Sequence, residues 1–394
     1  MHTMLEDYGV IIDEFLIDEF REQINENLDY SYNHFSNKEG KDQWGALCSC
    51  MDWITVSVRY IKRYPELSDD IDVKAMQIYS LISAIDIISE SVEQLHRIVI
   101  SQKLKEWPFK GRNSIFKEKV PHLSSRDDDH YFKEIRSIFG AHPTKLKNGD
   151  KEKLFASWPH EHSMSGFDFT VSISSNIVGK DDFSFGIHII ELLNYAKEKF
   201  EHLLFLIKGL DKLYKSCCAE LAKVMIPETD NIQDELVVLL DASIARYDND
   251  HYRYTLNELT KLFGVGVQED HLKGAEQELK DKLLPLVAEI RHNLQTMNLV
   301  DFKHSDVLVS SLPERALSYE LPKLFSILHS DHYDPLVNFY FKRLNEYCGE
   351  EYAFDVRNGD DVTLLKLRMM TYAARERTKT AVNLVEAESA HLKQ

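Results

Sequence analysis

The sequence is poor in cysteine and contains no long apolar run. Its 394 residues include five cysteines, and an odd number in a chain of this length does not favour a disulfide framework. The longest apolar stretches, such as residues 187–193 and 203–207, are much shorter than the roughly 18 residues that a transmembrane helix needs. The first 15 residues lack the basic segment and apolar run of a signal peptide. We therefore expect a reduced, cytoplasmic protein without a membrane span.

Basic residues are also in the minority. The chain has 47 lysines and arginines against 65 aspartates and glutamates, which gives a formal net charge of -18. This charge argues against non-specific binding of the whole surface to duplex DNA or to membranes. The Walker A, GxGxxG and GxSxG motifs are absent from the sequence, which argues against phosphate-loop, dinucleotide-binding and serine-hydrolase sites.

What the sequence does contain is a succession of amphipathic helical patterns. Hydrophobic residues make up 43% of the chain and charged residues 28%, which is typical of globular proteins and excludes wholesale disorder. Apolar residues at helical spacing predict long helices over residues 10–28, 43–61 and 70–103. A shorter fourth helix is predicted to follow the acidic run 127–129 and to end at Gly140. These four helices favour an up-and-down bundle within residues 1–150.

The remainder of the chain suggests a small β element and then more helices. Two short segments, 154–158 and 167–174, predict a β-hairpin, and apolar and polar residues alternate in the second of them. A long helix is predicted over 185–215, so residues 151–222 would complete or extend the bundle. Residues 223–394 are predicted to form an all-α domain of unknown role, with helices over 230–247, 252–263, 269–297, 320–329, 334–347 and 361–390. The expected fold class is therefore mainly α.

One segment, at the predicted end of the fourth helix, carries residues suited to chemistry. It reads YFKEIRSIFGAHP over residues 131–143, so that five residues separate Arg136 from His142. Cleavage of RNA without a metal needs a base for the ribose 2′-hydroxyl, an acid for the leaving 5′-oxygen and a cation at the phosphorane. Histidine can transfer protons near neutral pH, and arginine presents a charged fork that matches phosphate oxygens. Gly140 and Pro143 predict a helix break that relaxes the geometry between the two side chains.

The segment from Arg136 to His142, after three long predicted helices, resembles the Arg-X4–6-His motif of the HEPN superfamily of helical bundles. The resemblance covers about residues 5–150 and does not extend to the second half of the chain. Many members of the superfamily are metal-independent endoribonucleases of toxin–antitoxin, abortive-infection and CRISPR systems. The family often has Asn, Asp or His directly after the arginine, where this chain has Ser137.

The resemblance implies a toxin or phage-defence effector that cleaves RNA by attack of the 2′-hydroxyl. Arg136 and His142 would be the catalytic residues, while Ser137, Lys133 and Lys145 would bind the substrate. No metal or cofactor is expected. The implied partners are RNA, a second copy of the chain that completes a composite active site, and an antitoxin or regulatory protein.

A non-catalytic interpretation stands beside this one. The bundle would then be a HEPN-like nucleotide-binding or protein-interaction module. Separately, Arg136 and His142 could be purely structural, with Arg136 capping carbonyls or paired to a nearby acid and His142 in a turn before Pro143. Local charge favours RNA, because residues 103–153 contain 13 basic and eight acidic residues in an otherwise acidic chain. A second Arg-X4-His match, from Arg246 to His251, encloses two aspartates that would repel a phosphate.

Overall fold

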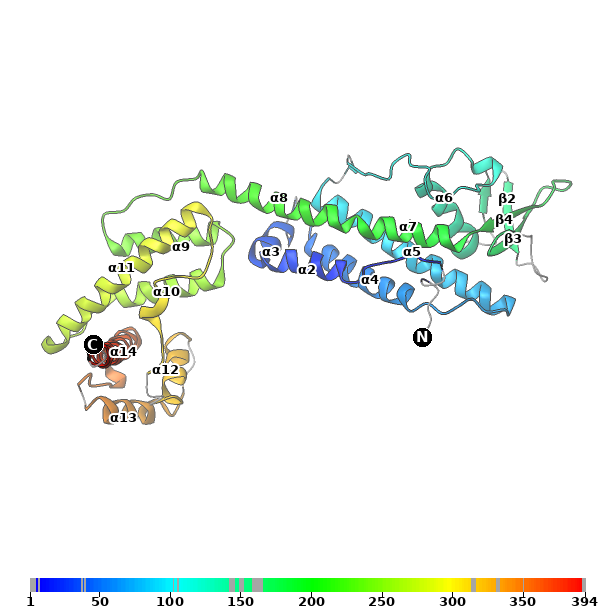
Figure 1. The fold of residues 1–394 in the computed structure, drawn as a ribbon. Coiled ribbons are helices and arrows are strands. Elements are labelled where there is room, and N and C mark those ends of the chain that lie inside the picture. Colours follow the sequence, from blue (N-terminus) through cyan, green and yellow to red (C-terminus); the bar gives the residue numbers. More distant parts are fainter. Residues whose placement is uncertain are drawn as a thin grey trace. The chain divides into compact units, whose positions relative to one another are not determined.

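The computed structural model divides the chain into two compact units, Met1–Lys215 and Ser216–Gln394 (Figure 1). Each unit has its own hydrophobic core. The structure describes residues 5, 8–36, 38, 40–101, 103–104, 106–141, 146–148, 152–157, 166–312, 317–330, 334–349 and 351–391. Within these ranges, residues 140–141, 146–148 and 381–391 are described by their backbone alone.

The first unit is mainly helical. Its helices are α2 (Leu16–Asn25), α3 (Leu28–Ser36), α4 (Trp44–Lys62), α5 (Ile71–Val99), α6 (Asp128–Arg136), α7 (Ile189–Glu201) and α8 (Leu203–Ala222), the last of which continues past Lys215. α4 and α5 confirm the helices predicted over 43–61 and 70–103. Asp70 begins α5 by accepting hydrogen bonds from the backbone of Asp72 and Val73. The predicted apolar stripe of α5 is buried and packs against α4 and α7.

Two of the predicted helices have different bounds in the structure. The helix predicted over 10–28 is shorter in the structure, where α2 spans Leu16–Asn25 and a separate helix, α3, begins at Leu28. The helix predicted over 185–215 begins later, at Ile189, and is divided into α7 and α8 at His202. Apolar periodicity did not locate these breaks because buried residues occur on both sides of each one.

An antiparallel sheet lies in the first unit (Figure 1). Its strands follow the order β1-β2-β3-β4. The strands are β1 (Leu146–Asn148), β2 (Glu152–Ser157), β3 (Phe169–Ser175) and β4 (Phe183–Ile187). β2 and β3 correspond to the predicted hairpin strands. β1 and β4 were not predicted, although Phe183, Phe185 and Ile187 alternate as a strand requires. Phe139, just after α6, packs on Phe185 with 5.7 Å between ring centroids, so the sheet contacts the segment that follows Arg136.

The second unit is helical throughout its described elements. They are α9 (Ile232–Ala245), α10 (Asp250–Gly264), α11 (Lys273–Thr296), α12 (Glu320–Leu328), α13 (Val337–Cys348) and α14 (Asp360–His391), with the short 3-10 helices Asp270–Leu272, Ser305–Leu308 and Val356–Asn358. These helices match the ones predicted from periodicity. Inside the core, Arg368 and Glu258 form an ion pair at 2.5 Å, and both side chains are almost fully buried. The helices of the described residues all fall short of the length and apolar character that crossing a membrane requires.

Candidate functional site

The candidate catalytic arginine is the last residue of α6. This helix ends at Arg136 and passes directly into a π-helical turn, Ser137–Ala141. The α-helix ends four residues before Gly140, where the sequence predicted its end, and the π-helical turn continues one residue past Gly140. Such turns are frequent at functional sites. Lys133, one turn before Arg136, is exposed, and Ser137 is half-buried. Three of the five predicted site residues therefore lie together at the C-terminal end of α6.

The remaining two predicted site residues, His142 and Lys145, lie outside the described residues. In the sequence, His142 follows the last residue of the π-helical turn directly.

Arg136 is held by a carboxylate from the long helix α5. Its Nε lies 3.0 Å from Asp86 Oδ2, and the side chains of Arg136 and Asp86 are 43% and 17% exposed. Burial raises the pKa of Asp86 above its usual range, although the cations Arg136 and Lys133 act to lower it. The ion pair holds the guanidinium at its Nε and leaves much of the Arg136 side chain exposed to solvent. Arg136 is thus paired with an acid, as the non-catalytic interpretation expected. The same ion pair is equally suited to orienting the guanidinium for binding a phosphate.

The three acids at the start of α6, residues 127–129, have structural roles beyond complementing the positive end of the helix. Asp127 caps α6 by accepting hydrogen bonds from the backbone and Nδ1 of His130, and it also accepts one from the backbone of Gly111. The buried Asp128 accepts hydrogen bonds from the backbone of Ser114, Ile115 and Phe116. These contacts hold the loop before α6 against the start of the helix.

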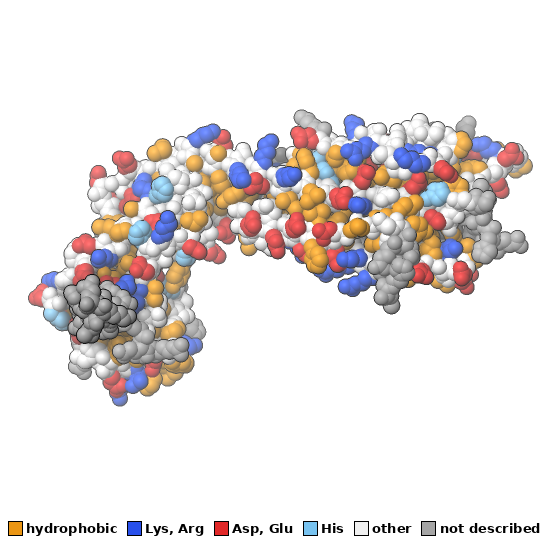
Figure 2. All heavy atoms as spheres, in the orientation of Figure 1, with side chains coloured by type: hydrophobic (Ala, Val, Ile, Leu, Met, Phe, Trp, Pro, Cys, Tyr) orange, Lys and Arg blue, Asp and Glu red, His pale blue; other side chains and the backbone are white. Residues whose placement is uncertain are grey.

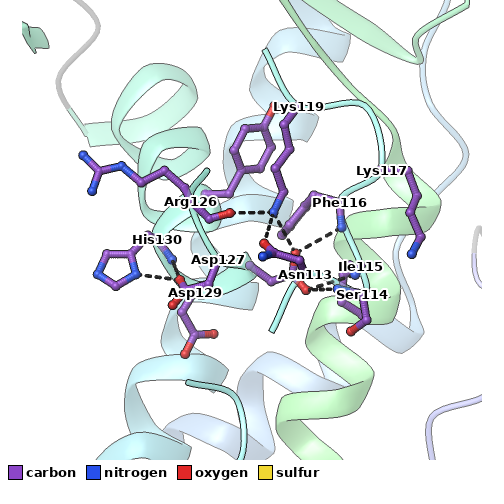
Figure 3. Close-up of polar contacts among 12 residues, drawn as sticks. Asn113, Ser114, Ile115, Phe116, Lys117, Lys119, Arg126, Asp127, Asp129 and His130 are labelled. Carbon is purple, nitrogen blue, oxygen red and sulfur yellow. Dashed lines mark hydrogen bonds and ion pairs between the residues drawn. The ribbon is translucent and has the colours of Figure 1, made fainter. Parts of the chain in front are cut away.

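Lys119 completes this cluster (Figure 3). Its ammonium lies 3.2 Å from Asp128 Oδ1, and the two side chains are only 6% and 5% exposed. Figure 3 shows Lys119 directed inward, towards Asn113 and the carbonyl of Arg126, while the side chains of Arg126 and Lys117 point away from the cluster. Lys119 was counted in the predicted positive patch, but it is used within the fold and is not available to a ligand.

Asp129, the third acid of the run, belongs to a second buried network. Its carboxylate lies 2.5 Å from Lys199 Nζ and accepts hydrogen bonds from Trp107 Nε1 and Tyr195. The ammonium of Lys199 also lies 3.8 Å from the centre of the Phe109 ring, which adds a cation–π contact. Burial lowers the pKa of Lys199, and Asp129 opposes that shift. This network ties the first turn of α6 to α7 and to the loop before α6.

A pair of buried histidines adjoins this network. His96 Nδ1 and His202 Nε2 are 2.9 Å apart, and the residues are 0% and 7% exposed. One nitrogen must donate and the other accept, so at least one of the two imidazoles must be neutral. Burial, followed by the proximity of His96 and Lys199, lowers the pKa of His202 to about 4. The break between α7 and α8 falls at His202, so this contact lies at the junction of the two helices.

We expect the first unit to lose stability as the pH falls from 7 towards 5. A histidine titrates near 6.5 in the unfolded chain, so the unfolded state takes up the proton first and is favoured by acid. The loss begins near pH 6.5 and is complete near pH 4. Thermal unfolding followed by tryptophan fluorescence reports on this unit alone, because all four tryptophans precede residue 216.

The variant His202→Gln provides the control for this pH dependence. Glutamine can still bond to His96 but does not titrate, so its unfolding midpoint should fall less between pH 7 and pH 5. An equal fall in both proteins would show that the histidine pair does not cause it.

The second Arg-X4-His match is structural. Arg246 is 5% exposed and donates a hydrogen bond from its guanidinium to the carbonyl of Val224. His251 instead stacks on Phe302, with ring centroids 4.7 Å apart. These contacts account for both residues within the second unit. Among the described residues, no group of three or more His, Cys, Asp or Glu side chains is placed to hold a metal ion.

No protein-family model, curated protein or solved structure matches the chain. The functional conclusion therefore depends on the residues themselves. Sequence reasoning missed Asp86 because nothing in the apolar stripe of α5 distinguishes it from other polar residues on that helix. Asp86 and Arg136 are 50 positions apart, so no local sequence pattern could indicate that they pair.

Proposed function

We propose that this chain is a metal-independent endoribonuclease of the HEPN type. The observation that carries the proposal is the position of Arg136: a partly exposed guanidinium, anchored by Asp86, at the end of α6 where the backbone turns into π-helical geometry. A half-buried serine and an exposed lysine accompany it. The sequence supplies His142 one residue beyond that turn.

In the proposed reaction, the ribose 2′-oxygen attacks the adjacent phosphorus and the bond to the 5′-oxygen breaks. The products are a 2′,3′-cyclic phosphate and a 5′-hydroxyl. His142 transfers protons, as a base towards the 2′-hydroxyl or an acid towards the 5′-oxygen. Arg136 stabilises the negative charge that grows on the phosphorane, and Asp86 keeps its guanidinium in position. Ser137, Lys133 and Lys145 bind the phosphates next to the cleaved bond.

A single arginine–histidine pair supplies few groups for both proton transfers. We therefore propose that the protein acts as a homodimer in which two copies of Arg136 and His142 share one cleft. The biological role that agrees best with such an enzyme is that of a cytoplasmic toxin or phage-defence effector. An antitoxin or regulatory protein would then restrain it, and residues 223–394 are available for target recognition or regulation.

The proposal predicts cleavage that needs the 2′-hydroxyl and no metal. Incubated with total RNA in excess EDTA, the full chain should cut RNA and leave 5′-hydroxyl ends. A synthetic RNA with one 2′-deoxynucleotide at the mapped cleavage position should resist cutting there, because the nucleophile is missing. Sensitivity to EDTA, or cutting at the deoxynucleotide, would contradict the mechanism. RNA binding without any cleavage would favour the non-catalytic module instead.

A further inference from the structure

A cavity lies at the junction of α7 and α8, beside the buried pair His96 and His202. Its volume is about 500 Å³, within the range of about 300–1,000 Å³ that is usual for small-molecule sites. Aromatic rings and charged groups of both signs line it, all from the first unit. The rings belong to Phe109, His202 and Phe205, and the charged groups to Glu106, Arg112, Glu198, Glu201 and Lys208. We call it the α7–α8 cavity.

Phe205 provides the cavity with an exposed aromatic ring. The ring stacks on the imidazole of His202, with 5.2 Å between the ring centroids and 16° between the planes. His202 is only 7% exposed, so this contact covers one side of Phe205, yet Phe205 as a whole remains 43% exposed. The open side of the ring is therefore available to a planar aromatic group. Stacking of bases on aromatic side chains is a common means of binding single-stranded nucleic acid.

His202 brings an unpaired nitrogen to the lining of the cavity. Its Nε2 is bonded to His96, whereas its Nδ1 has no hydrogen-bond partner in the described part of the chain. Burial holds the pKa of His202 at about 4, so the imidazole is neutral at pH 7 and Nδ1 donates or accepts according to the tautomer. Nearly all buried polar groups in proteins have a partner, so this nitrogen favours a ligand with a polar edge.

Glu201, the last residue of α7, supplies acceptor oxygens next to His202. Its side chain is 52% exposed, and its ion-pair partner, Lys197, is 3.8 Å away. Glu198 is instead paired with Arg112 at 3.5 Å. An ionised carboxylate accepts two hydrogen bonds side by side and donates none. Guanine is the one RNA base whose Watson–Crick edge presents two adjacent donor groups, N1–H and the 2-amino group, so guanine matches this acceptor best.

Exposed lysines continue from the cavity along α8. Lys208 lines the cavity, and Lys212 and Lys215 follow it at intervals of four and three residues, which puts all three on one side of the helix. Figure 2 shows basic side chains over α8. Lys215 pairs with Asp211 at 2.8 Å but remains 71% exposed. A row of exposed ammonium groups next to an aromatic ring is suited to the phosphates and bases of one RNA strand.

We propose that the α7–α8 cavity binds a guanine base of single-stranded RNA, next to the stretch that the protein cleaves. This rests on the proposed function, since the RNA is its substrate. The base stacks on Phe205, and its N1–H and 2-amino groups donate hydrogen bonds to Glu201. His202 Nδ1 forms a further hydrogen bond with the base, and the lysine row along α8 binds the phosphates on one side of it.

The cavity lies within reach of the candidate catalytic site on the same strand of RNA. Arg112, in the cavity lining, adjoins the start of α6, because its carbonyl accepts a hydrogen bond from the backbone of Asp128 at 2.8 Å. Arg136 ends the same helix, eight positions after Asp128, which corresponds to about 12 Å along the helix axis. Extended RNA spans such a distance with a few nucleotides. The cleaved bond and the recognised guanine are then a few nucleotides apart.

The test is the binding of oligonucleotides that cannot be cleaved. Strands with 2′-O-methyl groups lack the nucleophile, so fluorescence anisotropy of short labelled strands measures binding by the full chain without cleavage. A uridine strand with one central guanosine should bind about 10-fold more tightly than the all-uridine strand, the usual effect of one good base contact. Inosine in place of guanosine should lose most of that gain, because inosine lacks the 2-amino group.

Two variants with matched controls test the two contacts. Glu201→Gln should reduce the preference for guanosine over inosine to less than about twofold, since an amide cannot accept from both donor groups. Glu220→Gln, at an exposed carboxylate of α8 outside the cavity lining, should retain the preference. Phe205→Leu should weaken binding of the guanosine strand about 10-fold through the loss of stacking, whereas Phe15→Leu, at a ring that is 65% exposed, should leave it unchanged. Circular dichroism establishes that the variants are folded.

The outcomes separate this inference from the proposed function. Equal binding of the guanosine, inosine and uridine strands, or a guanosine preference that survives either Glu201→Gln or Phe205→Leu, overturns the guanine site even if the protein cleaves unmodified RNA. A preference that obeys both variants in a protein that never cleaves unmodified RNA supports the site and contradicts the enzyme. If both hold, the cleavage positions in total RNA should lie at a fixed distance of a few nucleotides from a guanine.

Discussion

Replacing Arg136 by alanine is expected to slow RNA cleavage by about 100- to 1,000-fold, the usual effect of removing a group that stabilises transition-state charge. Since Arg136 is a surface residue at a helix end, the fold should survive the change. Arg136→Lys should recover part of the rate, because lysine keeps the charge but lacks the planar fork. His142→Ala should lower the rate by a similar or larger factor, through the loss of proton transfer. Initial rates on one synthetic RNA in EDTA measure all three effects.

Arg126→Ala is the matched control for these variants. Arg126 is an exposed arginine close to the start of α6, and its guanidinium points away from the acidic cluster (Figure 3). Its removal should change the rate by less than about twofold, since surface charges away from a site have small effects. Equal rates for the wild type, Arg136→Ala and His142→Ala would contradict the catalytic roles proposed for Arg136 and His142. Expression in cells gives an independent readout, because Arg136→Ala should relieve any toxicity.

The largest stability effect is expected for Asp128→Ala. The substitution leaves the buried ammonium of Lys119 unpaired and removes the acceptor for the backbone of Ser114, Ile115 and Phe116. Breaking a buried ion pair in this way costs about 3–5 kcal/mol. Urea unfolding followed by tryptophan fluorescence measures the loss in the first unit.

Two further variants test the reason for that loss. Asp127→Ala removes the cap of α6 and should cost about 1 kcal/mol, the ordinary value for a helix N-cap. Adding Lys119→Met to Asp128→Ala removes the unpaired charge and should restore part of the stability. If Asp128→Ala were no more destabilising than Asp127→Ala, the loop before α6 would not depend on the buried pair.

The helices of this protein were predictable because their signals are local. α4, α5 and the helices of the second unit each bury one side, and burial of one side imposes apolar residues at helical spacing on the sequence itself. The end of the π-helical turn that follows α6, at Ala141, lies within one residue of the predicted helix end, since Gly140 and Pro143 disfavour a continuing helix wherever they occur. The change from α- to π-helical geometry at Arg136 was not predicted. Arg136, Ser137 and Lys133 could still be assigned to one helix end in advance.

The contacts that give those residues their surroundings were not predictable, because they join positions that are distant in the chain. Asp86 meets Arg136 across 50 residues, and His96 meets His202 across 106. From the sequence, the run Asp127–Asp129 was expected only to complement the positive end of a helix dipole. That expectation needs only local sequence, because it depends on the position of the acids in the first turn. Tertiary structure gave its three carboxylates separate partners, since adjacent residues on a helix point in different directions. By itself, then, the sequence determined the helices and the residue types at the candidate site, whereas packing decided which charges face each other and which remain open to a ligand.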